Sequence, residues 1–138
     1  MVETIETIWN LPRIELRDLS SIKETRRAAV LTGNRSWAAV GSLLELPTVV
    51  QAEPYTARYD VLEDLAKNLP EQVEVVYGVG GGLVCDVAKY VAWKNGLPSV
   101  IIPTTLSVDG FFTSLVAVRK DNTVYYENTG PASKVIVD

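Results

Sequence analysis

The sequence predicts an α/β fold in which a mostly parallel sheet carries helices on both faces. Short β-branched and other apolar runs alternate along the chain with segments whose apolar residues recur at helical spacing. The expected strands are apolar almost throughout, which is typical of parallel strands that are covered on both sides. A length of 138 residues with 47% apolar residues fits one globular domain spanning residues 1–138.

The strands are expected where short apolar runs are bounded by turn-forming residues. Asp121-Asn122 is expected to be the turn of a β-hairpin, since polar turn residues there separate two β-branched segments. The hairpin strands are residues 115–119 and 123–127. The other expected strands are residues 13–16, 28–32, 47–50, 73–79, 99–102 and 134–137.

Three helices are expected between these strands. Residues 36–44 are predicted to begin at Ser36 as the N-cap, with an apolar face formed by Ala38, Ala39 and Leu43. Residues 58–69 are amphipathic and end before Pro70. Residues 83–95 form a broad apolar stripe and end before Gly96, a C-cap signal.

Two residue types that support many enzyme sites are scarce. The sequence contains no histidine, and Cys85 is its one cysteine. Ser-His and Cys-His nucleophilic sites, zinc fingers and disulfides within the chain are therefore excluded. A metal held by imidazole would need ligands from another chain.

Charge and hydropathy limit the partners and the compartment. A net charge of −4 argues against a nucleic-acid partner, which calls for a basic surface. The acidic N-terminus lacks the pattern of a signal peptide, and no apolar run reaches the ~20 residues of a membrane span. The expectation is a cytoplasmic protein without a membrane partner.

The first segment that could bind a ligand is a glycine turn. Gly80, Gly81 and Gly82 stand between an expected strand and an expected helix. Glycines allow close backbone approach and a helix N-terminus favours anions, so the turn suits a pyrophosphate. The pattern is neither G-x-G-x-x-G nor a Walker A loop. A tight turn without a ligand is the alternative, in which Asp86 only complements the helix dipole.

A hydroxyl-rich segment follows the strand at residues 99–102. It contains Thr104, Thr105 and Ser107 ahead of Asp109, at the strand's carboxyl end where ligands bind in parallel sheets. Hydroxyls can bind ribose, phosphate or carboxamide, and a carboxylate can hold a polyol. A polar loop that turns at Asp109-Gly110 is the alternative.

Together these segments resemble a known enzyme family. The pattern reads Gly80-Gly81-Gly82-x-x-x-Asp86-x-Ala88-Lys89, then Leu97-Pro98, then Ile102-Pro103-Thr104-Thr105-x-Ser107-x-Asp109-Gly110. It resembles the iron-containing alcohol dehydrogenase superfamily, in its glycerol dehydrogenase and sn-glycerol-1-phosphate dehydrogenase branches. Residues 11–14 and 135–138 are similar as well, so the resemblance covers most of the chain.

The resemblance implies a Rossmann-like, dehydroquinate-synthase-like N-terminal domain that binds NAD or NADP. Gly80, Gly81 and Gly82 would hold the pyrophosphate, and Asp109 would lie near the hydroxyls of the substrate. Asp86 and Thr105 are further candidates for cofactor binding, and Lys89 matches the motif without an assigned role. The residues implied for the nicotinamide half are Thr104, Ser107, Thr113 and Leu115.

The resemblance also implies parts that this chain does not contain. A C-terminal helical domain would hold a divalent metal, zinc or iron, with ligands beyond Asp138, so the chain alone is expected to be inactive. The substrate would be glycerol, glycerol 1-phosphate or a similar polyol. A domain of a 3-dehydroquinate synthase-like lyase and a non-catalytic nucleotide-binding module are the alternatives. Apolar surface left uncovered would favour a homo-oligomer.

The turn after residues 28–32 bears on the choice of cofactor. A carboxylate commonly binds the adenine ribose at such a turn and repels a 2′-phosphate, but Gly33-Asn34-Arg35 contains none. Arg35 could pair with a phosphate, or be an ordinary solvated residue. The sequence therefore predicts that NADP(H) is accepted at least as well as NAD(H).

Overall fold

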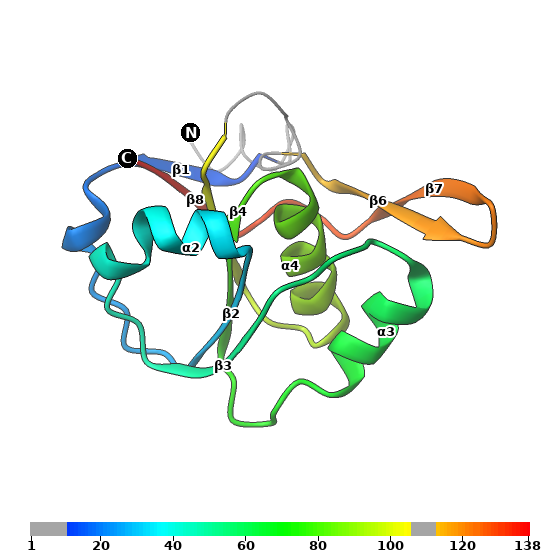
Figure 1. Ribbon diagram of the computed structural model, residues 1–138, viewed down its shortest axis with the longest axis horizontal. Coiled ribbons are helices and arrows are strands. Elements are labelled where there is room, and N and C mark those ends of the chain that lie inside the picture. The colour runs from blue at the N-terminus through cyan, green and yellow to red at the C-terminus, as the bar shows by residue number, and fades with distance from the viewer. Residues whose placement is uncertain (1–10, 106–112) are drawn as a thin grey trace, which may run out of the picture.

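Six parallel strands form the central sheet of the protein, in the order β1-β8-β5-β4-β2-β3 (Figure 1). The computed structural model describes residues 11–105 and 113–138. The predicted α/β class with a mostly parallel sheet is confirmed. The strands are β1 (Arg13–Leu16), β2 (Ala28–Thr32), β3 (Thr48–Ala52), β4 (Val75–Gly80), β5 (Ser99–Pro103) and β8 (Lys134–Val137).

Helices cover both faces of this sheet, as predicted. The described helices are α2 (Asn34–Val40), α3 (Tyr59–Lys67) and α4 (Gly82–Lys94), with short 3₁₀ turns at Leu19–Ser21 and Gly41–Leu43. Figure 1 shows α2 on one side of β2 and β4, and α4 and α3 on the other. No helix among the described residues has the length and apolar content that a membrane crossing requires.

Side chains from the two faces of β4 pack into two separate hydrophobic cores. Val75, Tyr77 and Val79 pack on the side of α2, whereas Val76 packs on the side of α4. Every residue of β4 is buried, which explains why its sequence is apolar without alternation. Each fully buried valine contributes roughly 1.5–3 kcal/mol to folding.

An antiparallel hairpin packs beside α4, and its predicted turn is confirmed. Strands β6 (Leu115–Lys120) and β7 (Thr123–Asn128) pair across Asp121-Asn122, and Asp121 has a φ of 57°. Aspartate tolerates this left-handed conformation better than most residues. Val116 and Val118 are fully buried in the core on the side of α4, so the hairpin is attached to the domain by its inner face.

Helix α2 differs from its prediction at both its start and its buried face. It begins at Asn34 with Gly33 as the N-cap, so Ser36 lies inside the helix and its prediction as N-cap is wrong. The carboxylate of Glu53, beyond β3, accepts a hydrogen bond from the Asn34 N–H at 3.1 Å and supplies the missing cap. The core contacts come from Trp37 and Val40, whereas Ala38, Ala39 and Leu43 are exposed, so the predicted apolar face is wrong.

Strands β1, β2 and β8 have the predicted bounds, and the remaining elements apart from α2 differ from prediction by one or two residues at their ends. Helices α3 and α4 lie within or one residue outside their expected ranges. The strand expected at residues 73–79 begins at Val75, because the N–H of Val73 closes a turn on the Pro70 carbonyl at 3.1 Å. These shifts do not move the glycine turn, which follows β4 directly.

Candidate functional site

The carboxyl ends of the central strands form one continuous edge. The Thr104 N–H, just beyond β5, donates to the Gly80 carbonyl at the end of β4 over 3.0 Å. The Thr32 hydroxyl, at the end of β2, donates to the Val79 carbonyl over 2.7 Å. These bonds hold the turns after β2, β4 and β5 together, so the predicted glycine and hydroxyl segments meet at this edge.

The glycines around the end of β4 have different reasons to be glycine. A Cβ on Gly78 would lie 2.6 Å from the Ala88 Cβ, and one on Gly80 would lie 3.1 Å from the Val84 side chain. Close packing of α4 on β4 therefore requires small residues at both positions. At Gly81 the nearest atom would be the Thr105 Cγ2 at an ordinary 3.6 Å.

Gly81 is thus not explained by the packing of the described residues. Its φ of −85° and ψ of −166° are accessible to any residue, so backbone conformation does not require glycine either. Gly82 is the first residue of α4, a helix of 13 residues whose free N–H groups lie at this turn. Among the described residues, a Cβ at Gly81 would meet only Thr105, and this space beside a helix N-terminus forms a cradle that a larger side chain would fill.

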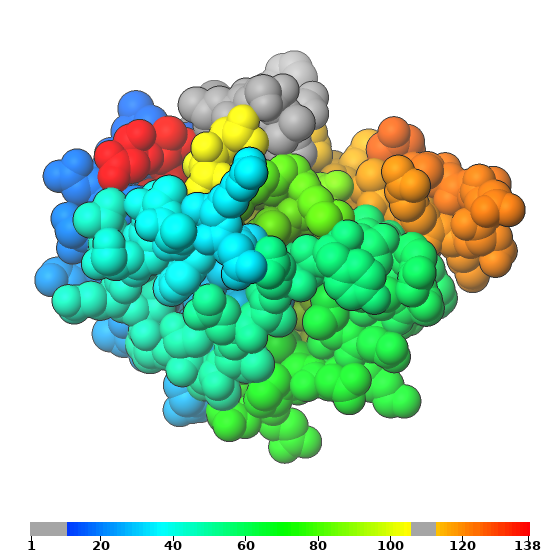
Figure 2. All heavy atoms as spheres, viewed as in Figure 1, coloured from blue at the N-terminus to red at the C-terminus, as the bar shows by residue number. Residues whose placement is uncertain are grey.

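Hydroxyl groups from two elements lie beside the glycine turn. The Ser36 hydroxyl, in the first turn of α2, lies 3.1 Å from the Thr104 hydroxyl, and 3.4 Å from where a Gly80 Cβ would stand. Thr104 and Thr105 are exposed and line a hollow of about 320 Å³ with Leu19 and Asp138. In Figure 2 the yellow spheres after β5 reach the surface beside cyan spheres of α2 and green spheres of α4.

Ser36 is the residue of this site that sequence reasoning missed. Its place before an apolar run suggested a helix cap, a local role. The usable signal was its distance from Gly33: a glycine N-cap would have placed Ser36 in the first turn, facing the edge of the sheet. The structure places Ser36 in that turn, with its hydroxyl 3.1 Å from the Thr104 hydroxyl.

Farther along α4, Asp86 and Lys89 contact the segment that contains Thr113 and Leu115. The Asp86 carboxylate accepts a hydrogen bond from the Ala117 N–H of β6 at 3.4 Å. The Lys89 ammonium donates to the carbonyls of Thr113 and Leu115. The described contacts of Asp86 thus serve the hairpin, and its contact with a cofactor stays a prediction. Ser107 and Asp109 lie outside the described residues.

A carboxylate does reach the turn that follows β2. Glu53 Oε2 lies 3.1 Å from the Asn34 nitrogen and 3.8 Å from where a Gly33 Cβ would stand. The turn contains no carboxylate of its own, but the pairing of β3 with β2 brings one from 19 residues away. Arg35 therefore shares this corner with a negative charge, which opposes the preference for NADP(H) predicted from Arg35 alone.

Cys85 lies beneath the glycine turn, and its thiol is unreactive. Its Sγ is 3.8 Å from the Gly80 carbonyl oxygen, and the residue is 1% exposed. Burial and the nearby Asp86 carboxylate raise the pKa of the thiol to about 12. A protonated, inaccessible thiol does not act as a nucleophile, so Cys85 serves packing under the turn.

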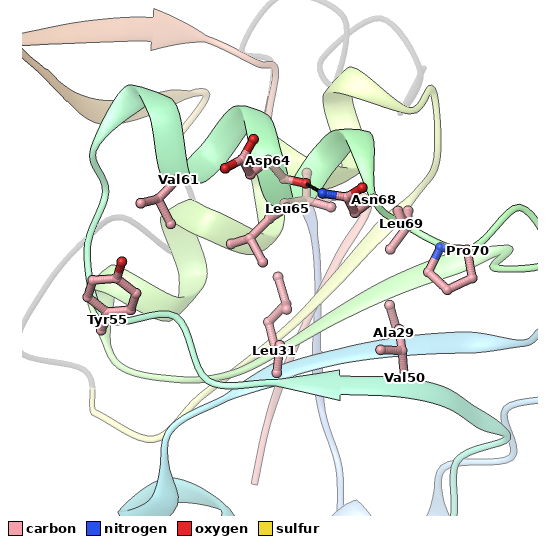
Figure 3. A pocket seen from close by; sticks show the side chains of 12 residues that line it. Ala29, Leu31, Val50, Tyr55, Val61, Asp64, Leu65, Asn68, Leu69 and Pro70 are labelled. Atoms are coloured by element: carbon pink, nitrogen blue, oxygen red, sulfur yellow. Dashed lines mark hydrogen bonds between the residues drawn. The ribbon is translucent and has the colours of Figure 1, made fainter.

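Among the described residues, the apolar pocket lies away from the predicted site residues, and no cluster of metal ligands is found. The pocket in Figure 3, about 280 Å³, lies between α3 and strands β2 and β3 and contains none of the predicted site residues. Within residues 11–105 and 113–138, no three His, Cys, Asp or Glu side chains are grouped to hold a metal. We therefore assign no metal site to the described residues.

The fold and this edge place the chain in a known class of protein. Residues 14–138 match the sequence profile of the iron-containing alcohol dehydrogenases, so the chain belongs to that family. It is 35% identical over 136 residues to the glycerol-1-phosphate dehydrogenase [NAD(P)+] of Thermofilum pendens, covering 93% of this chain. A 57-residue stretch is 46% identical to glycerol dehydrogenase 1 of Schizosaccharomyces pombe.

Solved structures show the same architecture. Glycerol dehydrogenase from Schizosaccharomyces pombe superimposes with a TM-score of 0.73 at 28% identity, over 93% of this chain and 37% of that one. A probable glycerol dehydrogenase from Sinorhizobium meliloti superimposes with a TM-score of 0.76 at 23% identity, which shows the fold. The chain spans 37% of the length of the Thermofilum pendens enzyme.

Proposed function

We propose that this chain is the nucleotide-binding part of an NAD(P)-dependent dehydrogenase that acts on glycerol, glycerol 1-phosphate or a similar polyol. The proposal rests on Gly81, whose lack of a side chain the described residues do not explain. Neither the packing of the described residues nor the backbone conformation demands glycine there, whereas a pyrophosphate lying against the backbone would. The relatives support the class, since their names are those of glycerol and glycerol-1-phosphate dehydrogenases.

The edge offers groups for the pyrophosphate and for the nicotinamide half of a dinucleotide. Gly81 and Gly82 present backbone N–H groups at the start of α4, where an anion is favoured. Thr104 and Thr105 add hydroxyls beside that turn. Thr113 and Leu115, held beside α4 by Lys89, would face the nicotinamide half. Ser107 remains a proposed cofactor contact, and Asp109 a proposed contact with the substrate hydroxyls.

Oxidation of an alcohol needs a group that accepts hydride from carbon and a group that polarises the alcohol oxygen. A bound nicotinamide would supply the hydride acceptor for oxidation of the alcohol. The residues of this chain would bind and orient it, keeping the reacting face toward the polyol. The divalent metal, zinc or iron, stays a prediction for a C-terminal helical domain, because the described residues offer no group of ligands for it.

The Gly81→Ala substitution tests the nucleotide site. A Cβ at Gly81 meets only an ordinary contact inside the protein, so the variant should keep its thermal midpoint. It should nevertheless lose at least about tenfold in NADH affinity, measured by calorimetric titration of the 138-residue chain, because the methyl group occupies the cradle. Gly81→Val should lose more.

Two controls make this experiment decisive. Glu71→Ala, at an exposed position ahead of β4, should change neither stability nor affinity. Gly78→Ala should lower the thermal midpoint, because its Cβ would overlap the Ala88 side chain. Absence of NADH and NADPH binding to the parent chain, or equal binding by the parent and Gly81→Ala, would contradict the proposal.

A further inference from the structure

Lys89 is a buried cation that has no role in the proposed pyrophosphate site at the glycine turn. It lies on the third turn of α4 and is 2% exposed. A buried ammonium is costly unless its three donors are satisfied. Its Nζ donates to the Thr113 carbonyl at 3.0 Å and the Leu115 carbonyl at 3.1 Å, and lies 3.5 Å from the Thr113 hydroxyl.

Asp86, one turn earlier on the same face of α4, complements Lys89. Its Oδ1 lies 3.9 Å from the Lys89 Nζ, and its Oδ2 accepts the Ala117 N–H at 3.4 Å. Lys89 thus donates to carbonyl groups of residues 113–117, and Asp86 accepts from an N–H group of the same segment. Together the two side chains fix the backbone of residues 113–117 against α4.

The hydroxyl of Thr113 is oriented by this arrangement. It donates to the Leu115 carbonyl at 3.2 Å, an oxygen that also accepts from Lys89. The Thr113 carbonyl and hydroxyl oxygens are therefore both tied to the Lys89 ammonium. Loss of that charge would take the ammonium donor from both carbonyls and leave the Thr113 hydroxyl held only by its bond to the Leu115 carbonyl among the described contacts, so the Thr113 side chain would be fixed less firmly.

This segment lies within reach of a ligand bound at the glycine turn. Seven residues of helix separate Gly82 from Lys89, a rise of roughly 10 Å. Long side chains on a helix lean toward its N-terminus, which brings the ammonium closer to the turn than its Cα. One half of a dinucleotide whose pyrophosphate rests at Gly81 can span that distance.

We propose that Lys89 is a positioning residue for the nicotinamide end of the cofactor, acting through the carbonyl and hydroxyl groups of Thr113 and the carbonyl of Leu115. The inference rests on the proposed nucleotide-binding function. Lys89 itself does not touch the cofactor. It holds the segment that does, with Asp86 fixing the continuation of that segment into β6.

A pair of ligands separates positioning from general stability. NADH and ADP-ribose share the adenosine and pyrophosphate, and only NADH carries the nicotinamide. We expect the parent chain to bind NADH more tightly than ADP-ribose. In Lys89→Met, which keeps an apolar stem without the charge, NADH affinity should fall about tenfold while ADP-ribose affinity changes less than about twofold.

Matched variants guard against a trivial loss of structure. Lys67→Met removes an exposed lysine from α3 and should leave both affinities unchanged. Where Lys89→Met fails to fold, Thr113→Val and Thr113→Ser replace it. Valine removes the hydroxyl and should lower NADH affinity alone, whereas serine keeps the hydroxyl and should restore it.

Each outcome decides between the two proposals. If the parent binds neither ligand, the nucleotide-binding function is wrong and the role of Lys89 falls with it. If the parent binds both ligands equally, or if Lys89→Met weakens both to the same extent, the nucleotide site stands and the positioning role is wrong. An NADH-specific loss in Lys89→Met, or in Thr113→Val with recovery in Thr113→Ser, supports it.

Discussion

The hydroxyl groups of Ser36 and Thr104 lie 3.1 Å apart, although 68 residues separate them in the sequence. Ser36 comes from the first turn of α2 and Thr104 from the end of β5, so the pair spans the glycine turn between them. Their contact, with the hydrogen bond from the Thr104 N–H to the Gly80 carbonyl, joins three segments at one edge of the sheet. Two adjacent hydroxyls beside Gly80 are suited to phosphate oxygens, which accept hydrogen bonds from both.

Removing one member of this pair tests its part in nucleotide binding. Ser36→Ala should lower NADH affinity roughly three- to tenfold, the effect of one hydrogen bond, and leave the thermal midpoint nearly unchanged because the contact is exposed to solvent. Fluorescence titration and thermal unfolding measure the two effects. Ser42→Ala, at an exposed position beyond α2, is the control. Unchanged affinity in Ser36→Ala would remove Ser36 from the site.

The corner at Gly33 predicts opposite effects for two charged residues on cofactor choice. Glu53→Gln removes a negative charge beside the Asn34 N–H and should raise NADPH affinity relative to NADH. Arg35→Ala removes a cation and should lower the same ratio. Both titrations belong at one fixed ionic strength, since exposed charges are screened by salt.

The parent chain provides the reference for these variants. NADPH bound at least as tightly as NADH would confirm the preference predicted from Arg35. A ratio that neither substitution moves would show that the 2′-phosphate lies away from this corner. The Glu53→Gln variant also loses part of its cap on α2, so its helix content should be checked by circular dichroism.

Glu24 predicts how the fold responds to acid. Burial opposes its ionisation, but hydrogen bonds from Arg26 and from the Tyr77 hydroxyl outweigh burial and lower its pKa to about 2. A carboxyl with a lowered folded-state pKa stabilises the fold above its unfolded value near 4.5, and this contribution is lost as the pH falls toward 2. The loss should amount to roughly 1–3 kcal/mol.

Urea unfolding between pH 6 and pH 2.5 measures this contribution. Glu24→Gln should be less stable than the parent at pH 6 and should lose less stability across that range. Glu45→Gln, at an exposed position, should follow the parent. Parallel curves for the parent and Glu24→Gln would show that Glu24 does not set the acid response.

Local patterns in the sequence determined most of the elements. Strands β1, β2 and β8 have the predicted bounds because apolar runs and their flanking turn residues act within a few positions. The hairpin was predictable for the same reason, since Asp121 supplies the conformation that the turn needs. The glycine turn was equally visible, because β4 and α4 flank it directly in the chain.

The tertiary structure decided what these elements do. The cap on α2 comes from Glu53, the partner of Ser36 is Thr104, and the buried charge of Lys89 is satisfied by Thr113 and Leu115. Each of these contacts joins residues 19 or more positions apart. Polar side chains have several possible partners of equal chemistry, and only the packing of the sheet and helices brings one of them within hydrogen-bond distance.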